Sequence, residues 1–168
     1  MHVHGFLPIT NPDARVLILG TMPSKVSLRE QQYYAHPQNK LWRIAGGILG
    51  FDADAAYEAR VSALAAAGIA LWDVLKTCTR ASSLDSDIEP DSIVPNDFQT
   101  FFAAHPRIRK VCFNGAKAEE LYMRHVRPGL ALPMDPMEYV RLPSTSPANA
   151  GTPLAEKVRA WQVIASHA

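Results

Sequence analysis

Four short strand-like segments, separated by helical patterns, constrain the fold of this chain more than any other feature. The first, at residues 15–20, is the apolar run Arg-Val-Leu-Ile-Leu-Gly, and residues 69–74, 110–115 and 139–143 are also predicted to be strands although they include a few polar residues. Continuous apolar segments of this length are typical of strands that are buried on both faces of a parallel sheet. Because helical patterns lie between them, the sequence predicts a parallel α/β sandwich.

Residue spacing and cap residues place the helices and loops. Helices are expected at residues 39–49, 53–67, 96–104, 116–126 and 154–166, the second ending at Gly68 and the third capped by Asn96 or Pro95. Loops are expected at residues 77–90, 127–137 and 144–152, which are polar, Pro- and Met-rich, or Ser/Pro-rich.

Length and charge limit the class of protein. The chain has 168 residues, which fits one domain over residues 1–168. Its formal net charge is only +1, so DNA binding would have to depend on a local patch and on backbone donors. No apolar run approaches the ~20 residues of a membrane span. The amino-terminal residues lack the basic and apolar regions of a signal peptide, so the cytoplasm is the expected location.

Cysteine and histidine give no support for a metal or redox centre. Cys78 and Cys112 are the only cysteines, which excludes a self-contained iron–sulfur cluster. Both lie near predicted strands, where buried free thiols are expected. The six histidines are scattered without the spacing of a zinc site, so no metal and no cofactor are predicted.

Conventional nucleophiles and acids are equally poorly supported. The chain has no Gly-x-Ser-x-Gly motif, and Ser144 and Ser146 lie in a Pro-flanked segment without an obvious paired base. Asp85 and Asp87 lie in the polar segment after the second strand. They could act as acid groups, but solvated loop carboxylates are the commoner role for such residues.

Polar side chains gather at the carboxyl ends of all four predicted strands. They belong to Gly20–Ser24, Asp73, Asn114 and Pro143–Asn149. Open parallel sheets bind ligands beyond the carboxyl ends of their strands. We therefore expect these residues to meet at one rim although they are far apart in the sequence.

An aromatic-rich loop follows the first strand and indicates what this rim could bind. Residues 33–42 have the sequence Tyr-Tyr-Ala-His-Pro-Gln-Asn-Lys-Leu-Trp. A Tyr ring can stack on a planar base, and the amide of Asn39 can hold a water or a carbonyl, which together suggest a site for a flipped-out nucleobase. The alternatives are core packing for Tyr33 and Tyr34 and a simple N-cap role for Asn39. The turn at residues 20–24 lacks the spacing of a dinucleotide fingerprint and of a P-loop.

A second informative segment follows the fourth strand. Residues 142–150 have the sequence Leu-Pro-Ser-Thr-Ser-Pro-Ala-Asn-Ala. Small hydroxyls and backbone N–H groups can hold a phosphate backbone, and residues 147–149 could press into a base stack. The alternative is a Ser/Pro-rich turn before the last helix.

Taken in order, these segments resemble the uracil-DNA glycosylase superfamily. The matching elements are Gly-x-x-Pro-Ser after the first strand, Tyr-Ala-His-Pro-x-Asn-x-x-Trp, Phe-Asn-Gly at a strand end, and Leu-Pro-Ser-x-Ser-Pro-Ala-x-Ala. The hypoxanthine (deoxyinosine) DNA glycosylases form the most similar branch, and the mismatch-specific uracil glycosylases are second. The resemblance implies a three-layer α/β/α sandwich with a central four-stranded parallel sheet. It also implies a monofunctional DNA glycosylase of base excision repair that acts as a monomer on double-stranded DNA containing a deaminated base.

The same resemblance assigns roles to residues. Most of the superfamily has a polar residue in the first turn to position the attacking water, whereas this chain has Met22 there. In the hypoxanthine branch the Asn of the aromatic loop takes the catalytic role, which implies catalysis by Asn39. Tyr34 matches the residue that stacks on the flipped base, and Met22 and Asn114 are expected to line the base pocket. Contacts to the DNA are expected from Pro23, Ser24, Ser144, Ser146, Pro147, Ala148 and Asn149.

Two other functions stay open at this point. One is a mismatch-specific uracil-DNA glycosylase. The other is a module of the same fold that binds a nucleotide or DNA without turnover, which the apolar Met22 keeps in consideration. Cleavage of a duplex at a deaminated base, lost on substitution of Asn39, would separate a glycosylase from a binding module.

Overall fold

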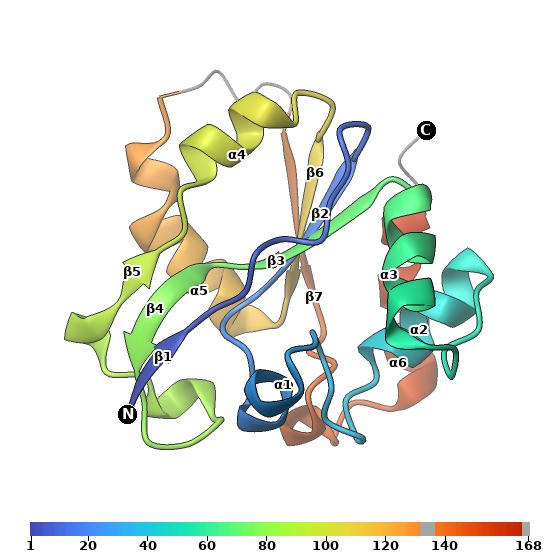
Figure 1. Cartoon of the computed structure of the whole chain (residues 1–168), viewed down its shortest axis with the longest axis horizontal. Helices are drawn as coiled ribbons and strands as arrows, with labels where there is room; N and C mark the ends of the chain where they lie inside the picture. The colour runs from blue at the N-terminus through green and yellow to red at the C-terminus, as the bar shows by residue number, and fades with distance from the viewer. Residues whose placement is uncertain (132–136, 166–168) are drawn as a thin grey trace.

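A four-stranded parallel sheet forms the centre of the computed structural model, which describes residues 1–131 and 137–165 (Figure 1). The strands are β1 (His2–His4), β2 (Val16–Gly20), β3 (Ile69–Asp73), β4 (Leu75–Thr79), β5 (Val94–Pro95), β6 (Lys110–Asn114) and β7 (Glu138–Leu142). The helices are α1 (Lys25–Glu30), α2 (Leu41–Leu49), α3 (Tyr57–Ala66), α4 (Phe98–Ala104), α5 (Ala116–His125) and α6 (Leu154–Trp161). Short 3-10 turns are η1 (Asp85–Asp87), η2 (Pro90–Ser92), η3 (Arg127–Gly129), η4 (Pro147–Asn149) and η5 (Gln162–Ala165).

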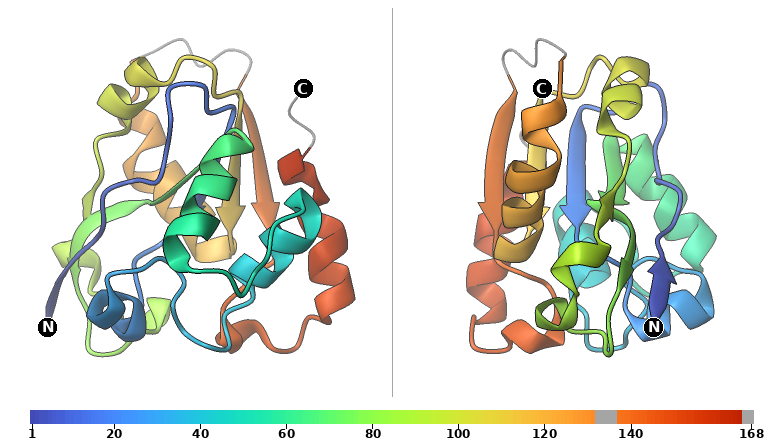
Figure 2. Two further views of the ribbon diagram at one scale, coloured as in Figure 1. Left: turned by 45° about the vertical axis from the view of Figure 1, so that its right-hand side comes forward. Right: turned by 90° about the vertical axis from the view of Figure 1, so that its left-hand side faces the viewer.

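The central sheet has the strand order β3-β2-β6-β7, and all of its pairs are parallel. Every residue of β2, β3 and β6 is buried, as expected for strands covered on both faces. The register places Gly20 opposite Asp73, so the ends of β2 and β3 lie level with each other. The strands point toward the end of the molecule where α1 lies (Figure 2).

Helices cover both faces of the sheet. Alternate residues of each strand point to opposite sides, so the apolar strands present side chains that pack with helices on each face. On one face, side chains such as Val16 and Ile18 pack with residues of α2, α3 and α6. On the other, Leu17 and Leu19 pack with residues of α4 and α5. The predicted three-layer α/β/α sandwich with a four-stranded parallel sheet is therefore confirmed.

A second, antiparallel sheet with the order β1-β4-β5 corrects the prediction of a loop at residues 77–90. The strand β4 occupies the first part of that segment, and its partners are β1 near the amino terminus and the two-residue β5. Cys78 lies opposite Val3 in this sheet. Its thiol and that of Cys112 are free and buried, as the sequence predicted.

Several helix bounds also differ from the prediction. The second predicted helix begins at Tyr57 and not at residue 53, because Asp52 forms a local turn by accepting a hydrogen bond from the N–H of Asp54. The next predicted helix is capped by Asp97, whose carboxylate accepts from the N–H of Thr100, and not by Asn96 or Pro95. The helix α1 was not predicted.

Smaller differences affect the other predicted elements. The predicted helix at residues 39–49 begins at Leu41, and that at residues 154–166 passes into the turn η5 after Trp161. The predicted loop at residues 127–137 begins with η3 and lies partly outside the described residues. Within the described part of the chain, no helix is both long enough and apolar enough to cross a membrane.

Candidate active site

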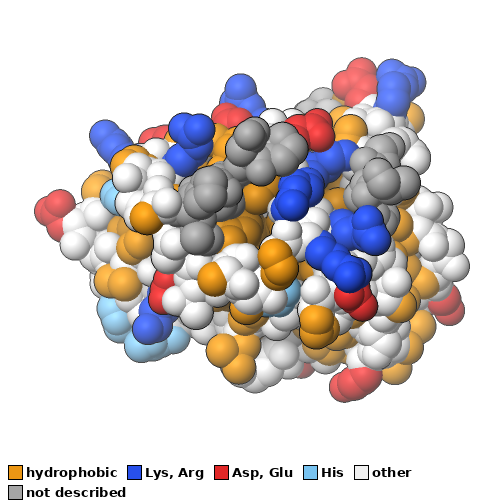
Figure 3. All heavy atoms as spheres, turned by 90° about the horizontal axis from the view of Figure 1, so that it is seen from above, with side chains coloured by type: hydrophobic (Ala, Val, Ile, Leu, Met, Phe, Trp, Pro, Cys, Tyr) orange, Lys and Arg blue, Asp and Glu red, His pale blue; other side chains and the backbone are white. Residues whose placement is uncertain are grey.

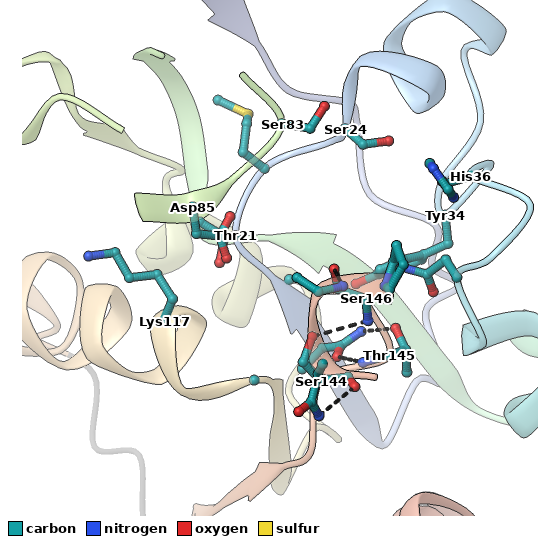
Figure 4. A pocket seen from close by; sticks show the side chains of 18 of the residues that line it. Thr21, Ser24, Tyr34, His36, Ser83, Asp85, Lys117, Ser144, Thr145 and Ser146 are labelled. Carbon is teal, nitrogen blue, oxygen red and sulfur yellow. Dashed lines mark hydrogen bonds between the residues drawn. The ribbon is translucent and has the colours of Figure 1, made fainter. Parts of the chain in front are cut away.

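A cavity of about 950 Å³ opens at the carboxyl ends of the parallel strands (Figure 4). This is within the ~300–1,000 Å³ range of small-molecule sites. Its walls come from the segment after β2, the aromatic loop before α2, the η1 segment, the end of β6 and the loop after β7. Each predicted site residue lines this cavity: Met22, Pro23, Ser24, Tyr34, Asn39, Asn114, Ser144, Ser146, Pro147, Ala148 and Asn149. The expected convergence of the strand ends is therefore observed, while the chemical role of each residue stays a prediction.

The segment after β2, residues 21–24, is called the first loop, and it is held by its own side chains and by Arg80. Ser24 caps α1, since its hydroxyl accepts a hydrogen bond of 3.2 Å from the N–H of Ser27. The buried guanidinium of Arg80 donates to the carbonyl of Pro23. Met22 lines the cavity but is only 8% exposed and belongs to the hydrophobic core. Its side chain therefore offers the cavity an apolar surface.

Two neighbouring tyrosines have different surroundings. Tyr33 is buried, its hydroxyl donates to the carbonyl of Leu7, and its own carbonyl accepts from the indole of Trp42. Tyr34 has a φ of 53°, a left-handed conformation that is unusual for a bulky residue. It is partly exposed and lines the cavity, which leaves part of its ring available to a base. The predicted core role therefore fits Tyr33, and the predicted base contact is geometrically open to Tyr34.

The hydroxyl of Tyr34 lies at the floor of the cavity. A Cβ added to Gly20 would come within 2.6 Å of this hydroxyl and within 2.6 Å of Asp73 Oδ1, so a side chain at the end of β2 would displace both groups. The hydroxyl is buried and makes no hydrogen bond of standard geometry to a described residue. Burial, reinforced by the charge of Asp73, raises the pKa of Tyr34 well above its usual range, although the Asn114 side chain lies near enough to lower it somewhat, so the phenol stays neutral.

Asn39 directs its amide to the start of α2. Its Oδ1 accepts a hydrogen bond of 3.0 Å from the N–H of Leu41. Lys40, the residue between them, donates its backbone N–H to the carbonyl of Thr145 at 3.1 Å. The N-cap position of α2 belongs to Lys40, which has no side-chain cap, so the N-cap alternative for Asn39 is not observed. The Asn39 oxygen instead accepts from the first helical residue, and no described residue accepts a hydrogen bond from Nδ2.

The loop after β7 is tied to the end of β6. The amide of Asn114 donates from Nδ2 to the hydroxyl of Thr145 and accepts at Oδ1 from the N–H of Thr145, both at 2.9 Å. Ser144 and Ser146 each accept a backbone N–H two residues ahead, at 3.1 and 3.2 Å. Their hydroxyl protons can still be donated to phosphate oxygens. Asn149 donates to the carbonyl of Ser144 and thereby closes the loop on itself.

Acidic residues of the cavity are the part that sequence reasoning left open. Asp73 is only 4% exposed and lines the cavity; burial, followed by the charge of Asp85, raises its pKa to about 7. Asp85 also lines the cavity and is partly buried, and burial raises its pKa as well. The expectation of a solvated loop carboxylate therefore holds for the exposed Asp87 but not for Asp85. Among the described residues, no three His, Cys, Asp or Glu side chains lie together as a metal site.

Comparison with known proteins places this geometry in a family. The family model for the Uracil DNA glycosylase superfamily matches residues 7–165. Two relatives are each named Hypoxanthine DNA glycosylase. The protein from Methanosarcina acetivorans is 42% identical over 117 residues, which cover 69% of this chain and 73% of that protein. The protein from Methanosarcina barkeri is 39% identical over 121 residues, covering 71% and 75%.

A solved structure agrees over nearly the whole chain. It is the solution NMR structure of a protein from Methanosarcina acetivorans described as a candidate uracil DNA glycosylase. The two chains superpose with a TM-score of 0.81 at 36% sequence identity, covering 99% of this chain and 98% of the other. The likeness therefore includes the four strand ends that surround the cavity.

Proposed function

This chain belongs to the uracil DNA glycosylase superfamily, and from that premise we propose that it is a hypoxanthine DNA glycosylase that releases the base from deoxyinosine in DNA. The proposal is supported by two relatives of about 40% identity that carry this name. One observation carries the catalytic assignment. Met22, in the segment after β2, gives the cavity an apolar surface, whereas Asn39, which lines the same cavity, has an amide nitrogen without a hydrogen-bond acceptor among the described residues.

The reaction replaces the bond between C1′ and the base nitrogen with a bond from C1′ to a water oxygen. The electron pair of the broken bond leaves with the base, and the water gives up a proton. The sugar passes through an oxocarbenium-like state, which is stabilised when a water is held below C1′ and the departing base is held by donors. In our proposal the amide of Asn39 holds that water. The DNA phosphates near the sugar add electrostatic stabilisation of its positive charge.

The flipped base occupies the cavity in this proposal. The accessible part of the Tyr34 ring stacks on it, and Met22 contributes apolar contact. Flipping costs a few kcal/mol, and less for a poorly paired base such as hypoxanthine. Asn114 lines the rim, but its amide already makes two hydrogen bonds to Thr145, so its main contribution is to fix the loop that contacts the DNA.

The DNA backbone is bound by loops more than by charge. The first loop offers Pro23 and Ser24, and the loop after β7 offers Ser144, Ser146, Pro147, Ala148 and Asn149. Lys117 and Arg141 also line the cavity and supply local positive charge, although each lies near a glutamate of α5, at 3.7 and 3.4 Å. Lys and Arg side chains also occur at the other end of the molecule, seen in Figure 3, so positive charge is not confined to the cavity rim. Residues 1–168 are proposed to act as one domain and as a cytoplasmic monomer.

A nicking assay tests the proposal. Duplexes with deoxyinosine, deoxyuridine or deoxyxanthosine at one position are incubated with the protein, and abasic sites are revealed by alkali. We expect release of hypoxanthine by the parent protein and none by Asn39→Ala, with binding of both proteins to the duplex. Binding without release of any deaminated base by the parent would instead indicate a non-catalytic DNA-binding module.

A further inference from the structure

Two polar groups at the floor of the cavity lack hydrogen-bond partners. They are the hydroxyl of Tyr34 and Oδ2 of Asp73, both buried. The two side chains meet at Gly20, since a Cβ added there would be 2.6 Å from the Tyr34 hydroxyl and 2.6 Å from Oδ1 of the same Asp73 carboxyl. A buried polar group without a partner costs about 1–3 kcal/mol, which a polar ligand in the cavity would offset. The carboxyl of Asp73 is therefore suited to contact a bound base.

The backbone holds Asp73 firmly at this place. Its register partner is Gly20, and the carbonyl of Gly20 accepts a hydrogen bond of 2.8 Å from the N–H of Val74. On the other side, the side-chain amide of Asn96 donates to the backbone carbonyl of Asp73 at 2.8 Å. Neither contact uses the carboxyl group, so the backbone positions the side chain and no hydrogen bond from a described residue occupies Oδ1, while Oδ2 is the more deeply buried oxygen.

Burial and the neighbouring carboxylate of Asp85 together favour the neutral form of Asp73. Burial is the largest effect, and the carboxylate of Asp85 on η1 acts in the same direction, so the pKa of Asp73 rises to about 7. Arg80, which follows β4, opposes this rise, but its guanidinium donates to the carbonyl of Pro23. From the aromatic loop, Tyr33 and Tyr34 face Asp73 as phenols whose pKa values are raised by burial, so they carry no charge. Below about pH 7 the carboxyl is therefore protonated, and above it the carboxyl ionises.

The reaction makes this distinction important. Negative charge builds up on the base as its bond to C1′ breaks. An ionised carboxylate beside the base would oppose that charge, whereas a neutral carboxyl can donate a hydrogen bond to it. Deaminated bases carry a carbonyl oxygen next to a ring N–H. A neutral carboxyl can donate its O–H to that carbonyl oxygen.

We propose that Asp73 is a second catalytic residue, which in its neutral form donates a hydrogen bond to the carbonyl oxygen of the departing deaminated base. This assignment rests on the proposed glycosylase function and names the group that stabilises the leaving base. The carboxyl proton stays on Asp73. The electron pair of the broken bond goes to the base, and the water supplies the only proton released.

The test measures base release from a deoxyinosine duplex under single-turnover conditions with enzyme below saturation, between pH 5.5 and 9. These conditions report ionisations of the free protein. For the parent we expect release to fall above about pH 7, approaching tenfold per pH unit. In Asp73→Asn, which keeps an N–H donor but cannot ionise, this fall should be absent and the rate at pH 6 should stay within about tenfold of the parent. Asp73→Ala should lower release by on the order of 10²-fold at every pH.

Two further variants separate the site from its surroundings. Asp85→Asn removes the neighbouring negative charge, so the fall should move to lower pH. Asp87→Asn changes an exposed carboxylate of the same turn that does not line the cavity, so the fall should stay in place. Thermal unfolding and binding to an abasic duplex check that every variant is folded.

The outcomes distinguish this role from the proposed function. A fall in rate that persists in Asp73→Asn, or parent-like release by Asp73→Ala, would overturn the role of Asp73 while leaving the glycosylase assignment intact. Complete loss in Asp73→Asn at all pH values would assign Asp73 to a role that needs its charge, and would also overturn the proposal. Absence of release by the parent protein from any duplex would overturn both.

Discussion

Asn114 and Thr145 are joined by two hydrogen bonds of 2.9 Å, one in each direction between the Asn114 amide and Thr145. Both residues are buried, and the bonds connect the end of β6 to the loop after β7 across 31 positions of sequence. They also support the amino end of α2, because the carbonyl of Thr145 accepts from the N–H of Lys40, next to Asn39. This pair therefore links two segments of the cavity wall.

Replacing Asn114 should affect both stability and activity. Asn114→Ala leaves the N–H and hydroxyl of Thr145 without these partners, at a cost of about 1–3 kcal/mol in the free energy of unfolding. Base release should also fall, because the loop after β7 loses its anchor. Denaturant unfolding measures the first effect and single-turnover kinetics the second. Parent-like stability would show that the two hydrogen bonds contribute nothing to the fold.

Replacing Asn39 should mainly affect the chemical step. Asn39→Ala removes the amide that holds the water in our proposal, so single-turnover base release should fall by on the order of 10²-fold or more, while duplex binding persists. The matched control is Gln38→Ala, which truncates the exposed neighbouring amide and should retain parent activity. Nearly normal release by Asn39→Ala would remove Asn39 from the mechanism.

Two substitutions of Tyr34 separate the role of the ring face from that of the hydroxyl. Tyr34→Ala removes stacking worth about 1–3 kcal/mol and should lose activity. Tyr34→Phe keeps the face and deletes a buried hydroxyl that has no partner among the described residues, so both activity and stability should be largely retained. If Phe proves as damaging as Ala in the release assay, the hydroxyl and not the face is what matters.

Chelation should not affect base release. The proposed chemistry needs a positioned water and donors to the leaving base, which the side chains of the cavity supply. Activity should therefore survive excess EDTA followed by buffer exchange. Loss of activity that a single divalent ion restores would contradict this expectation.

Substrate choice follows from the donors of the cavity. A deaminated base presents a carbonyl where its parent has an amine, and a donor that meets an amine stays unpaired. We expect hypoxanthine to be released most rapidly, uracil more slowly, and adenine and cytosine not at all. Lesions should be compared opposite the same partners at one salt concentration, because phosphate contacts make binding depend on salt. Equal or faster release of uracil would indicate a mismatch-type uracil glycosylase.

The sequence was sufficient for the central sheet and for the rim of the cavity. The apolar run of residues 16–20 indicates a buried strand locally, and parallel topology then brings the polar residues at the strand ends together. The local sequence pattern did not predict β4. Burial alternates only weakly along its five residues, and the strand is defined by its pairing with β1 and β5, which are distant in the sequence. The helix α1 was missed because it has only six residues and depends on the Ser24 cap.

The chemistry of the acidic residues could not be predicted for a related reason. Asp73 is an ordinary strand-end carboxylate in the sequence, and its raised pKa arises from burial and from Asp85, 12 positions away on a turn that folds beside it. Likewise, nothing in the sequence near Asn114 indicates that its amide is occupied by Thr145. Both properties arise from tertiary contacts alone.

The buried state of both cysteines makes the protein convenient for site-specific labelling. Burial raises the pKa of the Cys112 thiol to about 12 and also raises that of Cys78, so the reactive thiolates are scarce at neutral pH. Neither native cysteine needs to be removed before a maleimide fluorophore is attached elsewhere. Ser86 is exposed and lines the cavity, so a dye on Ser86→Cys would sit at the cavity to which we propose that DNA binds. Its emission could then follow the arrival of a duplex in real time, independently of base release.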